Sequence, residues 1–155
     1  MAKVKPIPEG MHTLTTQLSL DGASEAIELY KKAFGAEEIM RAPDPTGKKI
    51  WHAHLRIGDS TLFVNDIALE MGGRARTADL WIYLGDVDAA YQRATAAGLK
   101  AEMPPVDMFW GDRMSTVSDR WGNKFNIATH QKDLTPVEMQ KGQDEFLAQM
   151  AKGKK

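Results

Sequence analysis

Two histidines, His52 and His54, are the residues whose type and spacing most directly suggest chemistry. On a β-strand, side chains two positions apart point to the same side, so the two imidazoles are expected to be neighbours. Together with Asp79 they could form a metal site of two histidines and one carboxylate. The same residues could instead contact a ligand as polar groups, or lie on the surface. His54 and Asp79 could also act as an acid–base pair without a metal.

A second candidate is the segment Phe109-Trp110-Gly111-Asp112-Arg113, which is expected to form a loop. One interpretation is a lid in which Trp110 stacks on a planar or apolar ligand while Arg113 meets an anionic group. The other is a loop that is packed by Trp110 and held by an ion pair between Asp112 and Arg113, or by a similar contact. The lid predicts a compact, largely apolar ligand that carries an anionic or carbonyl oxygen.

The composition excludes several other chemistries. The chain has no cysteine, which excludes disulfides, thiolate nucleophiles and cysteine-based metal sites. It lacks the glycine-rich motifs of serine hydrolases and of nucleotide-phosphate loops. Twenty basic and 21 acidic residues give a net charge of −1, which argues against nucleic-acid and membrane-surface partners. Because no apolar run of a signal peptide follows Met1, a cytoplasmic location is expected.

The elements that must position these residues occur twice in the sequence. Apolar residues at helical spacing lie in 21–35 and again in 86–98, and a shift of 64 positions superimposes the two sets. The matched residues are Ala23, Ala26, Ile27, Tyr30 and Ala33, and Val87, Ala90, Tyr91, Ala94 and Ala97. Asp21 is expected to cap the N-terminus of the first helix and Gly35 its C-terminus. The shift predicts two copies of one structural unit.

Alternating segments predict the strands around each helix. One strand precedes each helix, at 14–20 and 79–84, and three follow, at 37–41, 50–57 and 61–65 and at 99–103, 113–118 and 124–129. We therefore expect an α+β fold in which tandem βαβββ units form curved mixed sheets around a cavity. A single domain is expected over 1–155, with unit one at about 11–67, unit two at about 78–130 and a C-terminal helix at about 135–151.

The alternation also separates two faces of the predicted sheets. The helix-facing set is apolar: Leu14, Leu18, Leu20, Leu55, Ile57, Leu62, Val64, Leu80, Ile82, Leu84, Phe125 and Ile127. The opposite set is polar and aromatic: Thr15, Gln17, His52, His54, Arg56, Phe63, Asp79, Trp81, Tyr83, Lys124 and Asn126. A sheet face in solvent would also be polar, but three aromatic residues favour a ligand pocket.

The tandem units, the helix at 21–35 and the Asp-Arg-Trp-Gly-Asn-Lys-Phe turn at 119–125 resemble the vicinal oxygen chelate superfamily. That superfamily includes glyoxalase I, bleomycin resistance proteins and extradiol dioxygenases, and the segments 109–113 and 127–133 resemble its PhnB-like branch. In its metal-dependent members, four His or Glu ligands come from the first and last strands of each unit. The repeat places these positions at Thr15, Asp79, Phe63 and Asn126, of which only Asp79 is a good ligand. The inherited metal site is therefore expected to be lost.

The resemblance implies a small-molecule-binding protein of the PhnB-like glyoxalase and bleomycin-resistance type, without a cofactor. It also implies a homodimer, to which the apolar side of the C-terminal helix could contribute. The alternatives are a metal-dependent lyase or dioxygenase with a rearranged site at His52, His54 and Asp79, and a metal-free acid–base enzyme. The expected ligand-binding residues are Thr15, Gln17, His52, His54, Phe63, Asp79, Trp81, Tyr83, Trp110, Arg113 and Asn126.

Overall fold

The structure is a computed structural model that describes residues 4–152. Residues 1–3, which begin the segment expected to lack a signal peptide, lie outside this range. The chain divides into two compact units. The first comprises the residues up to Ala78 and a short piece, Ala96–Gly98, and the second comprises Asp79–Thr95 and the residues from Leu99 onward.

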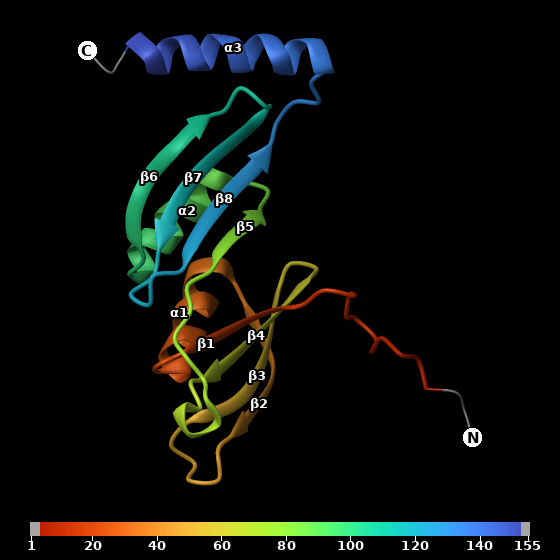
Figure 1. The fold of residues 1–155 in the computed structure, drawn as a ribbon, viewed down its shortest axis with the longest axis vertical. Helices are drawn as coiled ribbons and strands as arrows, with labels where there is room; N and C mark the ends of the chain where they lie inside the picture. The colour runs from red at the N-terminus through yellow and green to blue at the C-terminus, as the bar shows by residue number, and fades with distance from the viewer. Residues whose placement is uncertain (1–3, 153–155) are drawn as a thin grey trace. The chain divides into compact units, whose positions relative to one another are not determined.

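Unit one is built from one helix and one mixed sheet (Figure 1). Its elements are β1 (Thr16–Leu20), α1 (Ala23–Phe34), β2 (Glu37–Pro43), β3 (Ile50–Ile57) and β4 (Ser60–Asp66), followed by the short 3₁₀ turn η1 (Leu69–Met71). The strand order is β1-β4-β3-β2. The pair β1 and β4 is parallel and the other two pairs are antiparallel.

Unit two repeats this arrangement and adds a helix. Its elements are β5 (Asp79–Tyr83), α2 (Val87–Ala97), β6 (Lys100–Asp107), β7 (Asp112–Ser118), β8 (Lys124–His130) and α3 (Pro136–Lys152). The strand order, β5-β8-β7-β6, is the counterpart of the order in unit one. Both predicted βαβββ units and the C-terminal helix are thus confirmed.

Strand register also supports the predicted repeat. Gln17 pairs with Phe63 across β1 and β4, and Trp81 pairs with Asn126 across β5 and β8. These pairs correspond after shifts of 64 (81 − 17) and 63 (126 − 63), the shifts that the sequence predicts. One expectation is wrong: Leu14 precedes β1 and is 87% exposed, so it does not belong to the helix-facing set.

The strand β6 is longer than predicted, because it continues through Pro104 and Pro105 to Asp107. Proline lacks the N–H that a central strand needs, but β6 is the edge strand of its sheet. The pairing with β7 shifts register between Met103 and Val106, where the two prolines lie. An edge position and a local irregularity therefore accommodate residues that were expected to end the strand.

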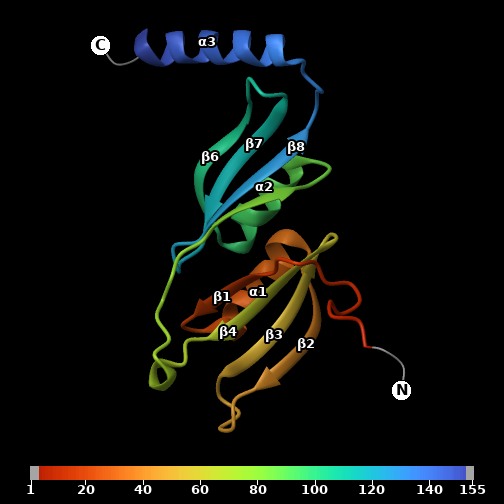
Figure 2. The same cartoon turned by 45° about the vertical axis from the view of Figure 1, so that its right-hand side comes forward.

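In each unit the helix covers one face of the sheet, and the core lies between them (Figures 1 and 2). In unit one the core includes Leu18, Leu20, Ile27, Tyr30, Leu55 and Val64, and in unit two Val87, Ala94, Val117, Phe125 and Ile127. All of these side chains are buried, which is the main stabilising contribution to a fold of this size. The opposite face of each sheet is not covered by the helix of its unit, and we call it the open face.

The two unit helices begin in different ways. In α2, Asp86 accepts a hydrogen bond from the backbone N–H of Ala89 at 2.9 Å, as a residue before a helix usually does. In α1 the N-cap position is occupied by Gly22, which has no side chain, so the predicted cap by Asp21 is wrong. Asp66, at the end of β4, supplies the missing acceptor.

Asp66 accepts three backbone hydrogen bonds. Its Oδ1 takes the N–H groups of Gly22 at 2.9 Å and Ala23 at 3.0 Å, and its Oδ2 takes the N–H of Ile50 at 2.6 Å. One carboxylate therefore joins the start of α1, the start of β3 and the end of β4. The C-terminal cap of α1 by Gly35 is confirmed, since Gly35 adopts the left-handed conformation and donates to Lys31.

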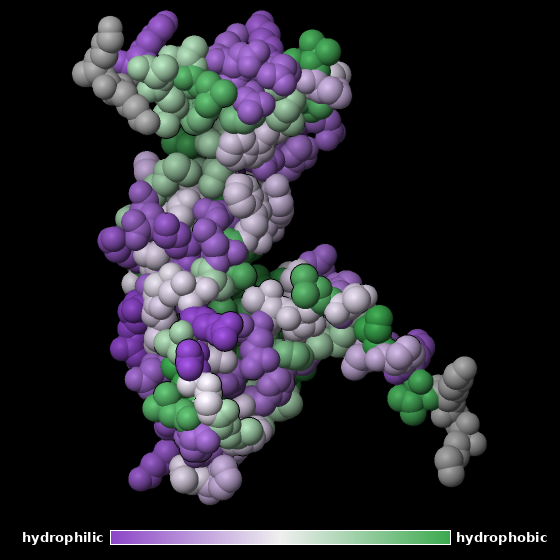
Figure 3. All heavy atoms as spheres, viewed as in Figure 1, coloured by the Kyte–Doolittle hydropathy of each residue, from purple (hydrophilic) through white to green (hydrophobic). Residues whose placement is uncertain are grey.

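Helix α3 starts with a capping box. The Thr135 N–H donates to Glu138 at 2.8 Å, and the Glu138 N–H donates back to the Thr135 hydroxyl at 3.3 Å. None of its residues is buried, and hydrophobic and hydrophilic residues are intermixed on it, at the top of Figure 3. Within residues 4–152, no helix combines the length and the apolar composition needed to cross a membrane.

Candidate functional site

The open face of the sheet in unit two carries a group of aromatic rings. Trp81 and Tyr83 alternate along β5 with the helix-facing Leu80 and Ile82, and their ring centroids are 6.3 Å apart. Trp110, from the loop between β6 and β7, lies 6.4 Å from Trp81. We call Trp81, Tyr83 and Trp110 the aromatic face. Trp81 is 46% exposed and Tyr83 61% exposed, so two of these rings are accessible to a ligand.

A buried carboxylate anchors two of these rings. Asp112, the first residue of β7, is only 3% exposed. Its Oδ2 accepts hydrogen bonds from the Tyr83 hydroxyl at 2.9 Å and from the Trp110 indole Nε1–H at 3.0 Å. Because both donors belong to the polar edges of aromatic rings, one carboxylate fixes the orientation of the phenol and of the indole.

His130, the last residue of β8, completes this polar cluster. Its Nδ1 lies 2.8 Å from Oδ1 of Asp112, and its Nε2 lies 3.0 Å from a carboxylate oxygen of Asp133. The hydrogen bonds with Asp112 and Asp133 raise the pKa of the imidazole above its ordinary value of 6.5. The protonated ring donates from both nitrogens, so it ties β8 to the segment that leads to α3.

The pKa values of the cluster follow from these contacts. Burial alone would raise the pKa of Asp112, but the hydrogen bonds from His130, Tyr83 and Trp110 outweigh burial and lower that pKa below its ordinary value. The bond that the Tyr83 hydroxyl donates to Asp112 raises the pKa of the phenol, because it stabilises the protonated form. The carboxylate is therefore ionised and the phenol protonated at neutral pH.

Asn126 joins the same open face to Asp79. Its amide Nδ2 donates to Asp79 Oδ1 at 2.7 Å, and its amide oxygen accepts from the Thr116 hydroxyl at 2.9 Å. Both ends of the Asn126 side chain therefore have partners. The chain of bonds runs across β7, β8 and β5 and holds the Asp79 carboxylate at the start of β5.

Arg113 lies on the opposite, helix-covered side of β7. Its guanidinium makes two hydrogen bonds to Asp88 of α2, at 2.7 and 2.9 Å, and one to Asp107 of β6 at 2.9 Å. The bonds to Asp88 and Asp107 raise its pKa, so the guanidinium stays charged. The suggested pairing with Asp112 is not made, because consecutive strand residues point to opposite faces.

The open face of unit one has a different character. The rings of His52 and His54 both contact the Phe63 ring, with centroid distances of 4.6 and 5.5 Å, so the two imidazoles share a face as expected. Nearby, the Gln17 side chain donates to the Asn65 amide oxygen at 2.8 Å. Thr15 is half-buried and directly precedes β1.

The side chains at the expected ligand positions do not fit a transition metal. Phe63 has no donor atom, and the amide oxygen of Asn126 already accepts the Thr116 hydroxyl. Among residues 4–152, no three or more His, Asp or Glu side chains are arranged to hold a metal ion. The chemistry of the donor set therefore argues against the metal site of the superfamily.

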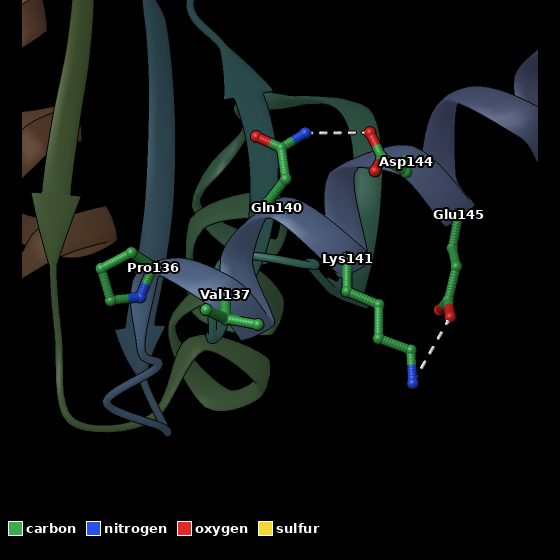
Figure 4. Close-up of a pocket in the computed structure, with 6 residues that line it drawn as sticks. All are labelled: Pro136, Val137, Gln140, Lys141, Asp144 and Glu145. Atoms are coloured by element: carbon green, nitrogen blue, oxygen red, sulfur yellow. Dashed lines mark hydrogen bonds and ion pairs between the residues drawn. The ribbon is translucent and has the colours of Figure 1, made fainter.

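Three cavities are lined by residues other than those of the aromatic face. A hollow of about 510 Å³ is lined by side chains of α3 alone: Pro136, Val137, Gln140, Lys141, Asp144 and Glu145 (Figure 4). Its polar groups pair within the helix, Gln140 with Asp144 at 2.9 Å and Lys141 with Glu145 at 3.9 Å. Two cavities in unit one, of about 230 and 280 Å³, share the side chain of Trp51. The carboxylate that they share, Asp66, is occupied by three backbone donors.

Three important residues were not among the predicted site residues. The sequence suggests Asp112 only as a partner of Arg113, and His130 is not among the expected ligand-binding residues. The spacing of His130 and Asp133 was a usable signal, because the two side chains bond to each other. Asp66 gave no local signal, because its partners lie 44, 43 and 16 residues earlier in the chain.

Comparisons with known proteins agree with this architecture. Residues 12–127 match the model of the glyoxalase/bleomycin resistance protein/dioxygenase superfamily. An uncharacterized protein of Mycobacterium bovis is 36% identical over 136 residues, which cover 82% of this chain and 89% of that protein. An uncharacterized protein of Mycobacterium tuberculosis is equally similar, with 79% of its length covered.

Solved structures show the same fold. TioX from Micromonospora sp. ML1 is 25% identical with a TM-score of 0.62, covering 77% of this chain and 98% of that one. A glyoxalase-related enzyme from Fulvimarina pelagi is 17% identical with a TM-score of 0.62, covering 76% and 87%. The matched residues, the relatives and the duplicated βαβββ unit agree, and the chain belongs to the glyoxalase/bleomycin resistance protein/dioxygenase superfamily.

Proposed function

We propose that the chain is a small-molecule-binding protein of the PhnB-like glyoxalase and bleomycin-resistance type, and that the aromatic face of unit two binds the ligand. The observation that carries the proposal is the anchoring of Tyr83 and Trp110 by the buried Asp112, beside an accessible Trp81. Rings that are fixed in orientation and still accessible can stack on a planar ligand at low entropic cost. The net charge of −1 favours a small molecule over a nucleic acid.

Polar groups of the same sheet lie beside the aromatic face and could orient a bound ligand. Asp79 and Asn126 lie on the same side as Trp81 and accompany it as proposed ligand contacts. Arg113 is held by Asp88 and Asp107, which favours a structural role, and its contact with an anionic group stays a prediction. The proposed contacts of unit one, Thr15, Gln17, His52, His54 and Phe63, also stay predictions.

The proposal is tested by a melting-shift screen of small aromatic compounds, followed by calorimetric titration of the hits. Replacing Trp110 by alanine is expected to weaken a hit by about 1 to 3 kcal/mol, the scale of a lost aromatic anchor. Trp51→Ala is the matched control, because Trp51 is an exposed indole of unit one outside the aromatic face. Equal affinity of wild type and Trp110→Ala for every hit would reject the face.

We also propose that the protein works without the superfamily's metal site. Phe63 and the occupied Asn126 amide support this, as does the weak donor Thr15. Elemental analysis of protein purified without metal-affinity columns is expected to find no stoichiometric transition metal. A ratio near one metal per chain that is abolished by His54→Ala would favour the lyase or dioxygenase alternative instead.

We further propose a cytoplasmic homodimer. The absence of cysteine agrees with a reducing compartment. The exposed side chains Val137, Leu147 and Met150 of α3 offer apolar surface that a second copy could cover. Light scattering at micromolar concentration is expected to give the mass of two chains, and removal of residues from Thr135 onward is expected to reduce it. A monomer mass for the full chain would reject the assembly.

A further inference from the structure

Helix α3 reaches the rest of unit two through one aromatic contact. The rings of Phe146 on α3 and Phe109 in the β6–β7 loop have centroids 5.5 Å apart. The helix backbone also comes close at Gly142, where an added Cβ would lie 3.1 Å from the Cβ and from the carbonyl oxygen of Phe109. Because no residue of α3 is buried, this contact carries much of the docking of the helix.

The same phenylalanine touches the aromatic face. The Phe109 ring meets the Trp110 ring edge-on, with centroids 5.0 Å apart and planes at 86°. Phe109 therefore contacts both Phe146 and Trp110. Edge-to-face contacts at this distance are favourable and directional, so the position of one ring influences that of the next.

The backbone joins the same two regions a second time. The carbonyl oxygen of Gly111 accepts the N–H groups of Gln131 at 3.0 Å and of Lys132 at 3.1 Å, in the segment that leads to α3. Gly111 has a φ of +96°, and a Cβ there would lie 2.3 Å from the carbonyl oxygen of Lys132. Only glycine allows this approach. The loop that carries Trp110 is thus held by α3 at one point and by the segment before α3 at another.

We propose that Phe109, Gly142 and Phe146 are positioning residues for Trp110, and that α3 is a detachable brace for the aromatic face. When α3 is docked, Phe109 holds the Trp110 indole toward Trp81, and Asp112 fixes its N–H. When α3 is displaced, the indole loses its edge contact and the face loses affinity. This inference rests on the proposed binding of a ligand at that face, and it makes α3 the point at which binding is regulated.

The first test follows the indole itself and needs no ligand. The four tryptophan indole N–H signals of the ¹⁵N-labelled full chain are recorded, and Trp110→Phe identifies the signal of Trp110. Phe146→Ala is expected to shift that signal and to raise its hydrogen-exchange rate about 2- to 10-fold. Phe146→Tyr, which keeps the ring, is expected to restore it. Gln149→Ala is the control on the same helix, because Gln149 is exposed and is not among the side chains proposed to meet a second copy.

Gly142→Ala separates positioning from simple helix stability. Alanine has a higher helix propensity than glycine, so a merely structural α3 would become more helical while Trp110 stays unchanged. If α3 positions Trp110, the environment of the Trp110 indole changes instead, because the new Cβ presses on Phe109 and moves the helix away. We expect the Trp110 signal to change as it does in Phe146→Ala. An unchanged Trp110 signal in both variants overturns the proposal.

The second test measures binding with 8-anilinonaphthalene-1-sulfonate, a flat aromatic probe with one anionic group. Phe146→Ala is expected to weaken the probe about 2- to 10-fold and Gln149→Ala less than 2-fold, with the circular dichroism of the sheets unchanged. Equal binding by wild type and Phe146→Ala overturns the brace, provided that Trp110→Ala weakens the probe. If Trp110→Ala binds the probe as wild type does, the proposed ligand face fails, and the indole signals alone decide the brace.

Discussion

Units one and two have the same strand order and the same parallel register, yet their corresponding positions carry different chemistry. Where unit two has Tyr83, Asp112 and His130, the shifts of 64, 62 and 63 positions lead to Ser19, Ile50 and Ile67 in unit one. Unit two uses these positions for a polar cluster around the buried Asp112, which anchors aromatic rings. The repeated backbone therefore constrains the fold, while the open face of each copy is free to diverge.

The helix caps differ in the same way. Unit two has Asp86 at its cap position, whereas unit one has Gly22 there and uses Asp66 from β4. In unit two the position that corresponds to Asp66 is Thr129, whose hydroxyl donates to the carbonyl oxygen of Leu84. The cap is thus local in unit two and tertiary in unit one. The two carboxylates are therefore expected to contribute differently to the free energy of unfolding.

The largest expected effect comes from exchanging these caps for alanine. Asp66→Ala leaves three partly buried N–H groups without a charged acceptor and is expected to cost about 3 kcal/mol, against about 1 kcal/mol for Asp86→Ala. Urea unfolding followed by circular dichroism measures both. Equal losses would contradict the contrast between a tertiary and a local cap.

The polar cluster of unit two is tested by Asp112→Asn. The amide keeps the size of the side chain but removes the charge that receives the Tyr83, Trp110 and His130 donors. We expect a loss of about 1 to 2 kcal/mol in the free energy of unfolding. The fluorescence of Trp110 is expected to change as well. Unchanged stability and fluorescence would mean that the Asp112 cluster neither stabilises unit two nor anchors its aromatic rings.

Because Asp112 and Asp133 raise the pKa of His130, the protonated imidazole stabilises the fold. This stabilisation is fully present below pH 6.5 and is lost as the pH rises through the raised pKa. Urea midpoints of wild type are therefore expected to fall from pH 6.5 upward by a component that His130→Gln lacks. The other three histidines remain in this variant as an internal control. Parallel pH profiles of the two proteins would contradict the assignment to His130.

The smallest effect is expected on the exposed edge of the open face. Asn126→Ala breaks the chain from Thr116 to Asp79, but the Asp79 end of this chain is exposed to solvent. The expected change in unfolding free energy is within about 0.5 kcal/mol. A loss above about 1.5 kcal/mol would show that this chain, and not only the Asp112 cluster, stabilises unit two.

The sequence predicts the fold of this protein well because the information is periodic. Matched apolar residues at a shift of 64 require the same helix twice, and alternation around Phe63 and Asn126 gives the strands their register. Both signals are local and are repeated, so an error in one copy is corrected by the other.

The site is harder to predict because its contacts join residues that are far apart in the chain. The direction of Arg113 depends on Asp88, which lies on a helix 25 residues earlier. The importance of Asp112 depends on burial, and no pattern in the sequence distinguishes a buried aspartate in a loop-like segment from an exposed one. Gly22 similarly gives no indication that Asp66 replaces its missing side chain.

The separation in sequence between Asp66 and its partners also affects the order in which elements form during synthesis. Asp66 follows Gly22 by 44 residues, whereas Asp86 precedes Ala89 by three. At about 5 to 20 residues per second, a ribosome needs about 2 to 9 s to add those 44 residues. During that time the N–H groups of Gly22 and Ala23 lack the Asp66 acceptor, whereas the N–H of Ala89 finds Asp86 before the first turn of α2 is complete. The first helix and the last strand of unit one are therefore expected to form in one step, and α2 to form ahead of its sheet.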